Sequence, residues 1–395
     1  MKKKYKILFI QPIGVFSGSL KSSEEYIKNL YKKFSFIFFT PRGYASKILS
    51  NYGRVFNTLG ICKFDNTENS HYKGIRWILI IREIIYFTFT IFNLIWIKLC
   101  IKEVDLIHLN EITGLPTAIL AKYLFKKPLI VHVRSLNNNK KNSKFSKLYF
   151  KIVEKFADKI LAIDNDVLGT INIKKKSTIL RNIFNLEKKK NLKKNVRKKQ
   201  KLRIGYIGTF LKYKGVEVLI NATEELFKKG YKIELVLAGA TIKRNFFLKK
   251  INQVLNIDSN IDENLLKKKF IVNLGFTKDI KNFYQKIDIL CFPSSLNSTG
   301  RQIFEAGMFS IPVIVCLKKK KYDGMIDKYN GLIYDDFFSI KKLQKKILFF
   351  YDNRKLIKKM GRNGKKLAFK RNLINNNIKR LNKIYITIIK KRLNS

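Results

Sequence analysis

The feature that most constrains the fold of this chain is an alternation of strand and helix that begins twice. Near the amino terminus the apolar run KILFI leads into a loop with Gly14 and Gly18, and a helical pattern follows. The same order returns at residues 202–210, where Gly208 follows the run LRIGYI. Short β-branched runs that alternate with helices indicate parallel sheets covered on both faces. We therefore predict two Rossmann-like, doubly wound α/β domains, with ligands at the carboxyl ends of their strands.

The clearest break between the two halves is the basic stretch at residues 187–201, where nine of 15 residues are Lys or Arg. This stretch has almost nothing to bury, so we predict a solvated linker. An amino-terminal domain is then expected at residues 1–186 and a carboxyl-terminal domain at residues 202–370. Residues 371–395 are predicted to form a terminal helix that could pack back on the first domain.

The segment Ile75–Ile101 is long and apolar, but Arg82 and Glu83 interrupt it and Lys98 closes its central run of 14 residues. A membrane span needs roughly 18 uninterrupted apolar residues. We expect a helix buried in the first domain. A helix on the bilayer surface is the alternative, because its flanks are basic, and a transmembrane helix is the third interpretation. The run Ile7–Ile10 is short for a secretion signal, so we expect a cytoplasmic protein.

The formal net charge is +54, from 82 basic and 28 acidic residues. The excess of lysine is compatible with a solvated surface encoded by an AT-rich genome. It is also compatible with attraction to an anionic partner, such as the inner membrane leaflet or a phosphate-bearing acceptor. A nucleic-acid-binding protein is the alternative from another class, but patches rich in arginine or aromatic residues are lacking. We therefore expect no nucleic-acid partner.

Two segments of the second half carry residues suited to a phosphate ligand. In Pro293–Val315, Ser298 or Thr299 is expected to cap a short helix. The N–H groups at Gly300 and Arg301 would then form an anion site that the helix dipole strengthens. The guanidinium of Arg301 would add a forked clamp.

Glu305 lies about one and a half turns into the same expected helix, and helix side chains lean back toward the amino end. Its carboxylate could accept hydrogen bonds from the two hydroxyls of a ribose. About 80 residues earlier, the turn at Gly208 and Thr209 is followed by Lys214. A glycine turn with a nearby ammonium suits a diphosphate, because the backbone can approach closely.

These segments resemble the retaining glycosyltransferases of the family often called glycosyl transferases group 1, which have the GT-B fold. The resemblance rests on GTFLKYKGVEVLINA, LVLAG, LGF, DIKNFYQKIDILCFPSS and TGRQIFEAGMFSIPVIV, which cover most of residues 204–315 in the expected order. The first half matches more loosely, through its early glycine loop, VDLIHLN, LIVHVRS and ILRN. The resemblance implies two domains that face a cleft.

The resemblance implies a role for each matching residue on the donor side. Gly208 and Lys214 would contact the donor diphosphate, Phe276 would lie near the base, and Glu305 would hold the ribose. The other residues expected at the donor site are Thr209, Ser295, Asn297, Gly300 and Arg301.

A second set of roles concerns the reaction. His132 matches a histidine that approaches the transferred sugar, and it is expected to act with Lys214 and Glu305 as a catalytic residue. Gly14 and Gly18 would border the acceptor side of the cleft.

Two departures from the family pattern affect the donor site. Thr209 stands where an arginine is common, so Lys214 and Arg301 must carry more of the charge. Asn297 stands where the first glutamate of a pair is usual, eight residues before Glu305. An asparagine can hydrogen-bond a sugar hydroxyl but carries no charge, so the identity of the sugar stays open.

The implied activity is a retaining, metal-independent hexosyl transfer from a nucleoside-diphosphate sugar, with UDP favoured and GDP possible. The acceptor would be a hydroxyl of a cell-surface glycan or a lipid-linked oligosaccharide precursor, as in polysaccharide or lipopolysaccharide biosynthesis for the cell envelope. The enzyme would bind peripherally to the inner face of the plasma membrane. A sugar-nucleotide epimerase of the same fold is an alternative. Asp164-Asn165-Asp166 has the DxD form of a metal site but lies far from the donor segments, so we expect no metal or other cofactor.

Overall fold

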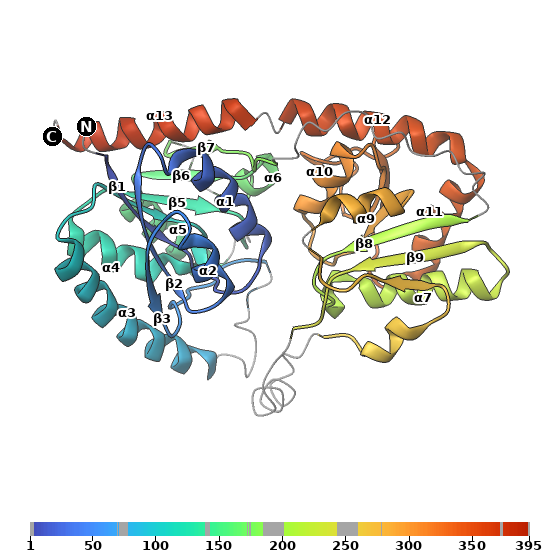
Figure 1. Ribbon diagram of the computed structural model, residues 1–395, viewed down its shortest axis with the longest axis horizontal. Coiled ribbons are helices and arrows are strands. Elements are labelled where there is room, and N and C mark those ends of the chain that lie inside the picture. The colour runs from blue at the N-terminus through green and yellow to red at the C-terminus, as the bar shows by residue number, and fades with distance from the viewer. Residues whose placement is uncertain are drawn as a thin grey trace. The chain divides into compact units, whose positions relative to one another are not determined.

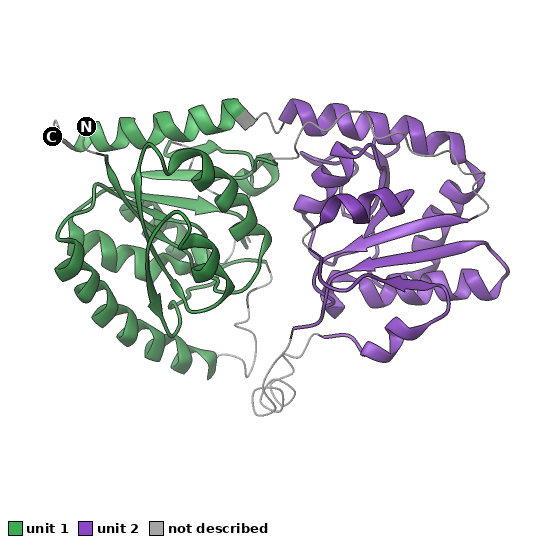
Figure 2. Cartoon of the chain, in the orientation of Figure 1, with its two compact units in different colours: residues 1–185, 372–395 green, residues 186–371 purple. Residues whose placement is uncertain are grey.

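The computed structural model describes residues 4–68, 70, 78–138, 143–171, 173, 175–184, 201–242, 260–277, 279–371 and 374–393. The chain divides into two compact units, unit 1 with residues 1–185 and 372–395, and unit 2 with residues 186–371 (Figure 2). Each unit is a parallel sheet with helices on it (Figure 1), so the predicted pair of α/β domains is confirmed. The predicted basic linker, apart from Lys201, lies outside the described residues.

The described part of unit 1 contains a seven-stranded parallel sheet of order β3-β2-β1-β4-β5-β6-β7. The strands are β1 Lys6–Ile10, β2 Ser35–Pro41, β3 Gly53–Thr58, β4 Leu106–Leu109, β5 Leu129–Val133, β6 Lys159–Ala162 and β7 Ser177–Ile179. The helices are α1 Gly18–Leu30, α2 Tyr44–Leu49, α3 Leu79–Ile101, η2 Ile112–Gly114, α4 Leu115–Phe125, α5 Lys144–Phe156, α6 Asn165–Leu168 and α13 Ile374–Leu393. The strand order reverses between β1 and β4, the place where such sheets bind ligands.

The two faces of this sheet bury two separate apolar layers. In β1, Leu8 belongs to a core with α3, α4 and α5, whereas Phe9 belongs to a core with α1, α2 and α13. This division follows from the two-residue period of a strand, which sends neighbouring side chains to opposite faces. A parallel sheet buried on both faces therefore needs the uniformly apolar runs that the sequence shows.

Helix α13 completes one of these layers although it lies at the end of the chain. Its buried residues Leu381, Tyr385 and Ile389 recur every four positions, which places them on one face. The hydroxyl of Tyr385 is also 2.6 Å from Nδ1 of the buried His108 in β4. The terminal helix thus supplies both apolar contact and a polar partner to the core of unit 1.

The prediction that the apolar segment Ile75–Ile101 is buried is wrong. Its helix, α3, turns only a narrow stripe inward, and the buried residues on that stripe are Glu83, Thr90, Leu94 and Ile97. The helix is long and apolar enough to cross a membrane, yet only 17% of its most hydrophobic window is buried. Composition could not indicate this, because a helix that is apolar on all sides does not show which side its neighbours cover.

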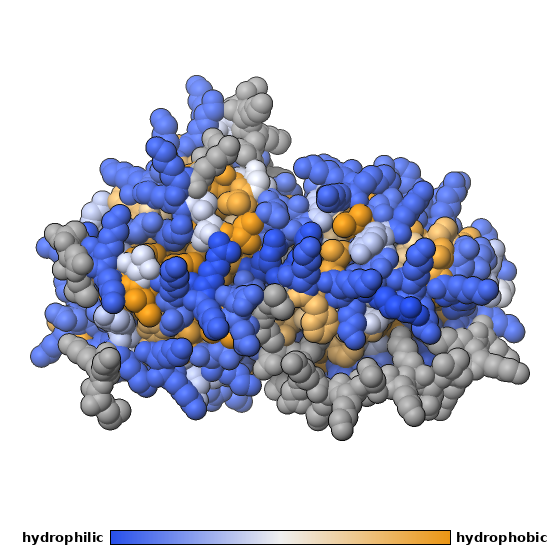
Figure 3. Space-filling view, turned by 90° about the horizontal axis from the view of Figure 1, so that it is seen from above, coloured by the Kyte–Doolittle hydropathy of each residue, from blue (hydrophilic) through white to orange (hydrophobic). Residues whose placement is uncertain are grey.

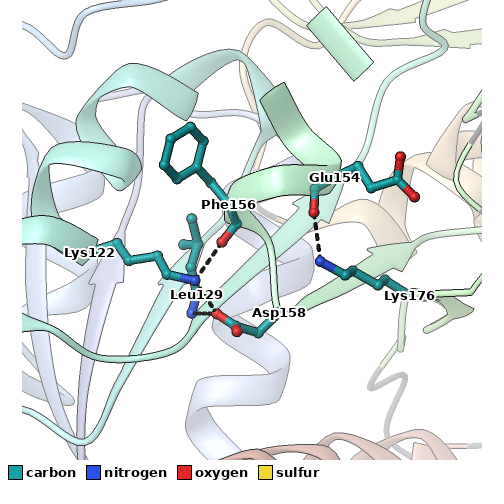
Figure 4. Close-up of polar contacts among 6 residues, drawn as sticks. All are labelled: Lys122, Leu129, Glu154, Phe156, Asp158 and Lys176. Atoms are coloured by element: carbon teal, nitrogen blue, oxygen red, sulfur yellow. Dashed lines mark hydrogen bonds and ion pairs between the residues drawn. The ribbon is translucent and has the colours of Figure 1, made fainter. Parts of the chain in front are cut away.

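A set of polar contacts holds the amino ends of β5 and β6 together (Figure 4). The carboxylate of Asp158 accepts the backbone N–H of Leu129 at 2.7 Å and the ammonium of Lys122 at 2.6 Å. Lys122 also donates to the carbonyl of Phe156 at 2.7 Å. These groups lie at the end of the sheet opposite to the carboxyl ends of its strands, so we assign them a structural role.

The described part of unit 2 contains a six-stranded parallel sheet of order β10-β9-β8-β11-β12-β13. The strands are β8 Leu202–Ile207, β9 Ile233–Ala238, β10 Ile271–Asn273, β11 Ile289–Phe292, β12 Val313–Cys316 and β13 Gly331–Tyr334. The helices are η3 Lys212–Lys214, α7 Val216–Lys228, η4 Glu263–Lys267, α9 Ile280–Lys286, α10 Arg301–Met308, α11 Ile340–Asp352 and α12 Arg354–Arg371. The order reverses between β8 and β11, so the two predicted phosphate segments follow neighbouring strands.

Candidate functional site

Three glycines meet at the carboxyl ends of β8, β9 and β10. The N–H of Gly208 donates to the carbonyl of Ala238 at 2.9 Å, and the N–H of Gly239 donates to the carbonyl of Gly275 at 2.8 Å. A Cβ on Gly239 would lie 1.8 Å from the carbonyl oxygen of Gly208. All three glycines have positive φ, at 151°, 154° and 63°. Sequence analysis selected Gly208 alone, although Gly239 and Gly275 also follow apolar runs directly.

The loop before α7 contacts the segment after β11. The backbone N–H and the hydroxyl of Ser295 donate to the carbonyl of Tyr213 at 2.9 and 3.0 Å. Gly215 has φ 76°, and a Cβ there would lie 1.8 Å from the carbonyl oxygen of Pro293. The two segments, 82 residues apart at Tyr213 and Ser295, therefore form one surface.

Lys214 is the cation at this surface. Its ammonium lies 3.4 Å from the hydroxyl of Thr209, and the side chain is partly buried. Removal from water lowers the pKa of Lys214, because burial disfavours the charged form. Within the described residues no salt bridge joins Lys214 to a carboxylate. A partly desolvated ammonium without an acidic partner is suited to an anionic ligand.

The first turn of α10 presents polar groups without side-chain partners. The N-cap is Gly300, and no side chain caps the helix, so the expectation that Ser298 or Thr299 serves as N-cap is wrong. A glycine at this position has no side chain to accept the first N–H groups. In addition, the hydroxyl of Thr299 is buried and has no hydrogen-bond partner in the described structure. Together these groups can receive an anion.

Gln302 was missed by the sequence analysis, but its side chain lies between the two glycine turns. A Cβ on Gly208 would be 3.7 Å from Nε2 of Gln302, and a Cβ on Gly300 would be 2.6 Å from its Oε1. The amide of Gln302 therefore lies close to both turns, at ordinary van der Waals distance from a Cβ on Gly208 and closer to one on Gly300. No motif signals this position, because a glutamine near the start of a helix is unremarkable in sequence.

Glu305 and Arg301 form a buried ion pair within α10. The Nε of Arg301 donates to Oε1 of Glu305 at 2.7 Å, and the two side chains are only 10% and 5% exposed. The hydroxyl of Tyr284 lies 3.3 Å from Oε2 of the same carboxylate. In this structure Arg301 therefore orients Glu305 instead of extending as a phosphate clamp. The expected contact of Glu305 with a ribose stays a prediction.

The side chain of Asn297 is held by hydrogen bonds, whereas the ring of Phe276 is exposed. The Oδ1 atom of Asn297 accepts the backbone N–H of Lys318 at 3.0 Å and the hydroxyl of Tyr322. These contacts tie its loop to the segment after β12. Phe276 follows Gly275 and is 51% exposed, so its ring is accessible at the end of β10. An exposed aromatic ring in that place is suited to contact with a base.

The two glycines predicted on the acceptor side lie after β1 in unit 1. A Cβ on Gly14 would be 3.0 Å from Cβ of Pro41, and the carbonyl of Gly14 accepts the N–H of Ala45 at 2.8 Å. Gly18 begins α1, and nothing lies within 4 Å of a Cβ built there. Gly14 thus allows close packing, whereas Gly18 leaves open space at the first turn of the helix.

His132 is buried in β5. Its Nδ1 lies 3.3 Å from Nη2 of Arg134, and its ring centroid is 5.5 Å from that of His108. Burial and the nearby guanidinium lower the pKa of His132 well below 6.5, so the imidazole is neutral. Its Nε2 is buried without a partner in the described structure. The expected contact of His132 with a sugar stays a prediction.

A polar cluster that sequence analysis did not select surrounds Arg134 at the carboxyl ends of β4 and β5. Arg134 donates to Oδ1 of Asn110 and to Oδ1 of Asn182, both at 2.9 Å. Beside it the hydroxyl of Ser135 donates to Glu111 at 3.0 Å. Burial raises the pKa of Glu111 to about 7. The available signal was the polar residues at the ends of the segments VDLIHLN and LIVHVRS.

The raised pKa of Glu111 predicts a pH dependence of stability. Folding raises this pKa from 4.5 to about 7, so the folded chain retains a proton that the unfolded chain loses in this range. The contribution of Glu111 to stability should therefore fall as the pH rises from 4.5 to 7, by about 3 kcal/mol, and then level off. Urea unfolding of wild type and Glu111→Gln at several pH values measures this. If the free energy of unfolding depends on pH in the same way for the two proteins, the prediction is wrong.

The DxD sequence has a structural explanation. The carboxylate of Asp164 accepts the N–H of Val167 at 2.7 Å and thereby caps α6. Over the described ranges, no group of three or more His, Cys, Asp or Glu side chains is placed to hold a metal ion.

Comparison with known proteins shows similarity to glycosyltransferases. Residues 187–367 match the family described as "Glycosyl transferases group 1". The chain is 27% identical over 278 residues to the uncharacterized glycosyltransferase MJ1178 of Methanocaldococcus jannaschii, covering 68% of this chain and 72% of that protein. It is 26% identical over 169 residues to CapM of Staphylococcus aureus, a capsular polysaccharide biosynthesis glycosyltransferase, covering 41% of this chain and 40% of CapM.

The fold is similar to that of solved glycosyltransferase structures. HepE of Anabaena, solved in complex with UDP and glucose, superimposes with a TM-score of 0.71. The match covers 96% of this chain and 99% of HepE at 15% sequence identity. The chain is a glycosyltransferase of GT-B fold, and its residues 187–367 match the family Glycosyl transferases group 1.

Proposed function

We propose that this enzyme transfers a hexosyl group from a UDP-sugar, with retention of anomeric configuration and without a metal ion. The acceptor is a hydroxyl of a cell-surface glycan or of a lipid-linked precursor. The observation that carries the proposal is the joining of the Lys214 loop to the segment that starts α10, through Ser295 and Gly215. This contact brings the ammonium of Lys214 and the amino end of α10 to one surface, and the same helix holds the carboxylate of Glu305.

The polar groups of this surface match the parts of a nucleoside diphosphate. Lys214 and the first turn of α10 suit the two phosphates, and the exposed ring of Phe276 suits the base. Glu305, held by Arg301 and Tyr284, suits the ribose hydroxyls. A UDP donor is supported by HepE, which has the same fold and was solved with UDP. GDP is the alternative nucleotide.

The chemistry that these groups support is stabilisation of the leaving group. When the bond between the anomeric carbon and the diphosphate oxygen breaks, negative charge develops on the diphosphate and the sugar becomes oxocarbenium-like. Lys214 and the N–H groups at Gly300 and Arg301 are already oriented, so they can stabilise that charge with little reorganisation. The acceptor oxygen then attacks from the face that the diphosphate leaves, and its proton passes to the departing diphosphate oxygen.

The proposed acceptor class rests on the relatives. CapM acts in capsular polysaccharide biosynthesis, and this chain matches it at 26% identity. A neutral His132 could position the sugar or polarise a hydroxyl, since its Nε2 is unpartnered in the described structure. We place the selection of the acceptor in unit 1.

Calorimetry with UDP, GDP and ADP tests the donor site. Wild type should bind UDP, and Glu305→Gln should weaken binding about 10- to 100-fold, because a charged acceptor is lost at the ribose. Glu225→Gln is the matched control, since Glu225 accepts a hydrogen bond from Gln344 on another helix. The donor-site assignment is wrong if no nucleotide binds, or if both variants bind UDP like wild type.

A further inference from the structure

The outward face of α3 is a largely apolar surface, with the exposed Thr88 as a polar residue within it. Its large exposed side chains are Ile81, Ile84, Ile85, Phe89, Phe92, Ile95, Trp96 and Leu99. At 100° per residue these positions lie within a band opposite to the buried stripe. From Ile81 to Leu99 the band is roughly 27 Å long. The band carries no charged residue, and surfaces of this kind mark interaction sites in soluble proteins.

The opposite side of α3 is anchored in unit 1. Glu83 accepts the backbone N–H of Lys63 at 2.7 Å, and Leu94 and Ile97 are fully buried in the same core as α4. A Cβ on Gly60 would lie 2.5 Å from the ring of Tyr86. If α3 crossed a membrane, all of these contacts would be lost and a carboxylate would enter hydrocarbon. The geometry therefore favours a helix that lies along a surface with one face immersed.

The residues around the apolar band are those of a membrane interface. Arg82 lies beside its amino end, while Lys98 and Lys102 are exposed near its carboxyl end. The neighbouring α4 adds Tyr123, which is 63% exposed. Lysine stems can extend along lipid and keep their charges in the headgroups, where Trp and Tyr also concentrate. The net charge of +54 complements an anionic leaflet.

The apolar character of this band is not a general property of the surface. Figure 3 shows a face of the molecule on which hydrophilic residues predominate and apolar residues are scattered. We infer that the band on α3 is a membrane-docking surface, which places unit 1 on an anionic phospholipid leaflet with α3 parallel to the bilayer plane. This inference does not depend on which sugar the enzyme transfers.

Flotation with phospholipid vesicles tests the inference on the full-length protein. Phe92→Gln/Trp96→Gln should reduce the bound fraction on anionic vesicles at least about tenfold, because two side chains that enter the acyl region are lost. Phe338→Gln/Phe369→Gln is the matched control, since these unit 2 side chains are 83% and 47% exposed, against 67% and 60% for the α3 pair. The control should bind like wild type. High salt should weaken wild-type binding, because the electrostatic part is screened.

Three results would overturn the inference. The first is equal vesicle binding by wild type and the α3 variant. The second is equal loss of binding in both variants. The third is a wild type that does not bind vesicles but forms a dimer without lipid in ultracentrifugation, where the α3 substitutions dissociate that dimer. The band would then contact a second copy of the chain. UDP binding of each variant is measured in parallel, so that failure of the donor site is distinguished from failure of docking.

Depth measurement separates a helix in the plane from one that spans the bilayer. The chain contains two tryptophans, Trp77 and Trp96, which can both be replaced by Phe. Ile81→Trp and Leu99→Trp, introduced one at a time, then report the depth of each end through quenching by brominated lipids. Equal, shallow depths are expected for an in-plane helix. Clearly different depths would show that α3 spans the membrane and would overturn the inference.

Discussion

Replacing Lys214 by Met is expected to lower the rate of UDP release from a UDP-sugar about 10²- to 10³-fold. The ammonium is partly buried, lies 3.4 Å from the hydroxyl of Thr209, and has no salt bridge within the described residues. In the proposed donor site it would stabilise the charge that develops on the leaving diphosphate. Methionine keeps the length of the apolar stem, so the loop should persist. Steady-state kinetics of UDP release measure the effect.

Calorimetry locates the effect of this substitution. Lys214→Met should lose UDP affinity but keep its affinity for uridine, which has no phosphate. Lys212→Met is the matched control, because Lys212 is exposed in the same short helix and its replacement removes the same charge from the loop. Equal losses of UDP affinity in the two variants would mean that Lys214 acts only through general electrostatic attraction. If neither variant loses UDP affinity, the assignment of Lys214 to the donor site is wrong.

Replacing Gly215 by Ala is expected to lower the free energy of unfolding by at least about 2 kcal/mol and to abolish measurable UDP binding. The residue has φ 76°, and its Cβ would lie 1.8 Å from the carbonyl oxygen of Pro293. Backbone strain and a clash with backbone therefore coincide. To relieve the clash, the Lys214 loop must move away from the segment that starts α10, and the ligand groups separate. Urea unfolding and calorimetry measure the two effects.

Gly230→Ala separates backbone strain from the clash with Pro293 as the cause of these effects. Gly230 has φ 85°, similar to Gly215, but nothing lies within 4 Å of a Cβ built there. Strain alone should cost about 1 kcal/mol and leave UDP binding unchanged. If Gly230→Ala weakens UDP binding as much as Gly215→Ala, the contact with Pro293 does not organise the site.

The wrong expectation for α3 and the unexpected pairing of Arg301 have different physical origins. The exposure of α3 depends on residues distant in sequence, whereas Arg301 pairs with a residue one turn along its own helix. The inward stripe of α3 meets the loop after β3 and helix α4, whereas nothing in the described structure covers its outward band. Arg301 was predicted to face a ligand because it starts a helix. The structure gives it Glu305, one turn further along, as a partner.

The amino-acid sequence by itself determined the two parallel α/β units, and it selected the two segments of unit 2 for which we propose phosphate binding. These are local properties, because strand and helix periods, glycine turns and a lysine beside a glycine act over a few residues. Only the tertiary structure decided that Gly239 meets Gly208, that Gly215 meets Pro293, and that Tyr385 reaches His108. It also decided which face of α3 stays exposed. Such contacts join residues far apart in the chain, and burial by distant neighbours cannot be inferred from local pattern.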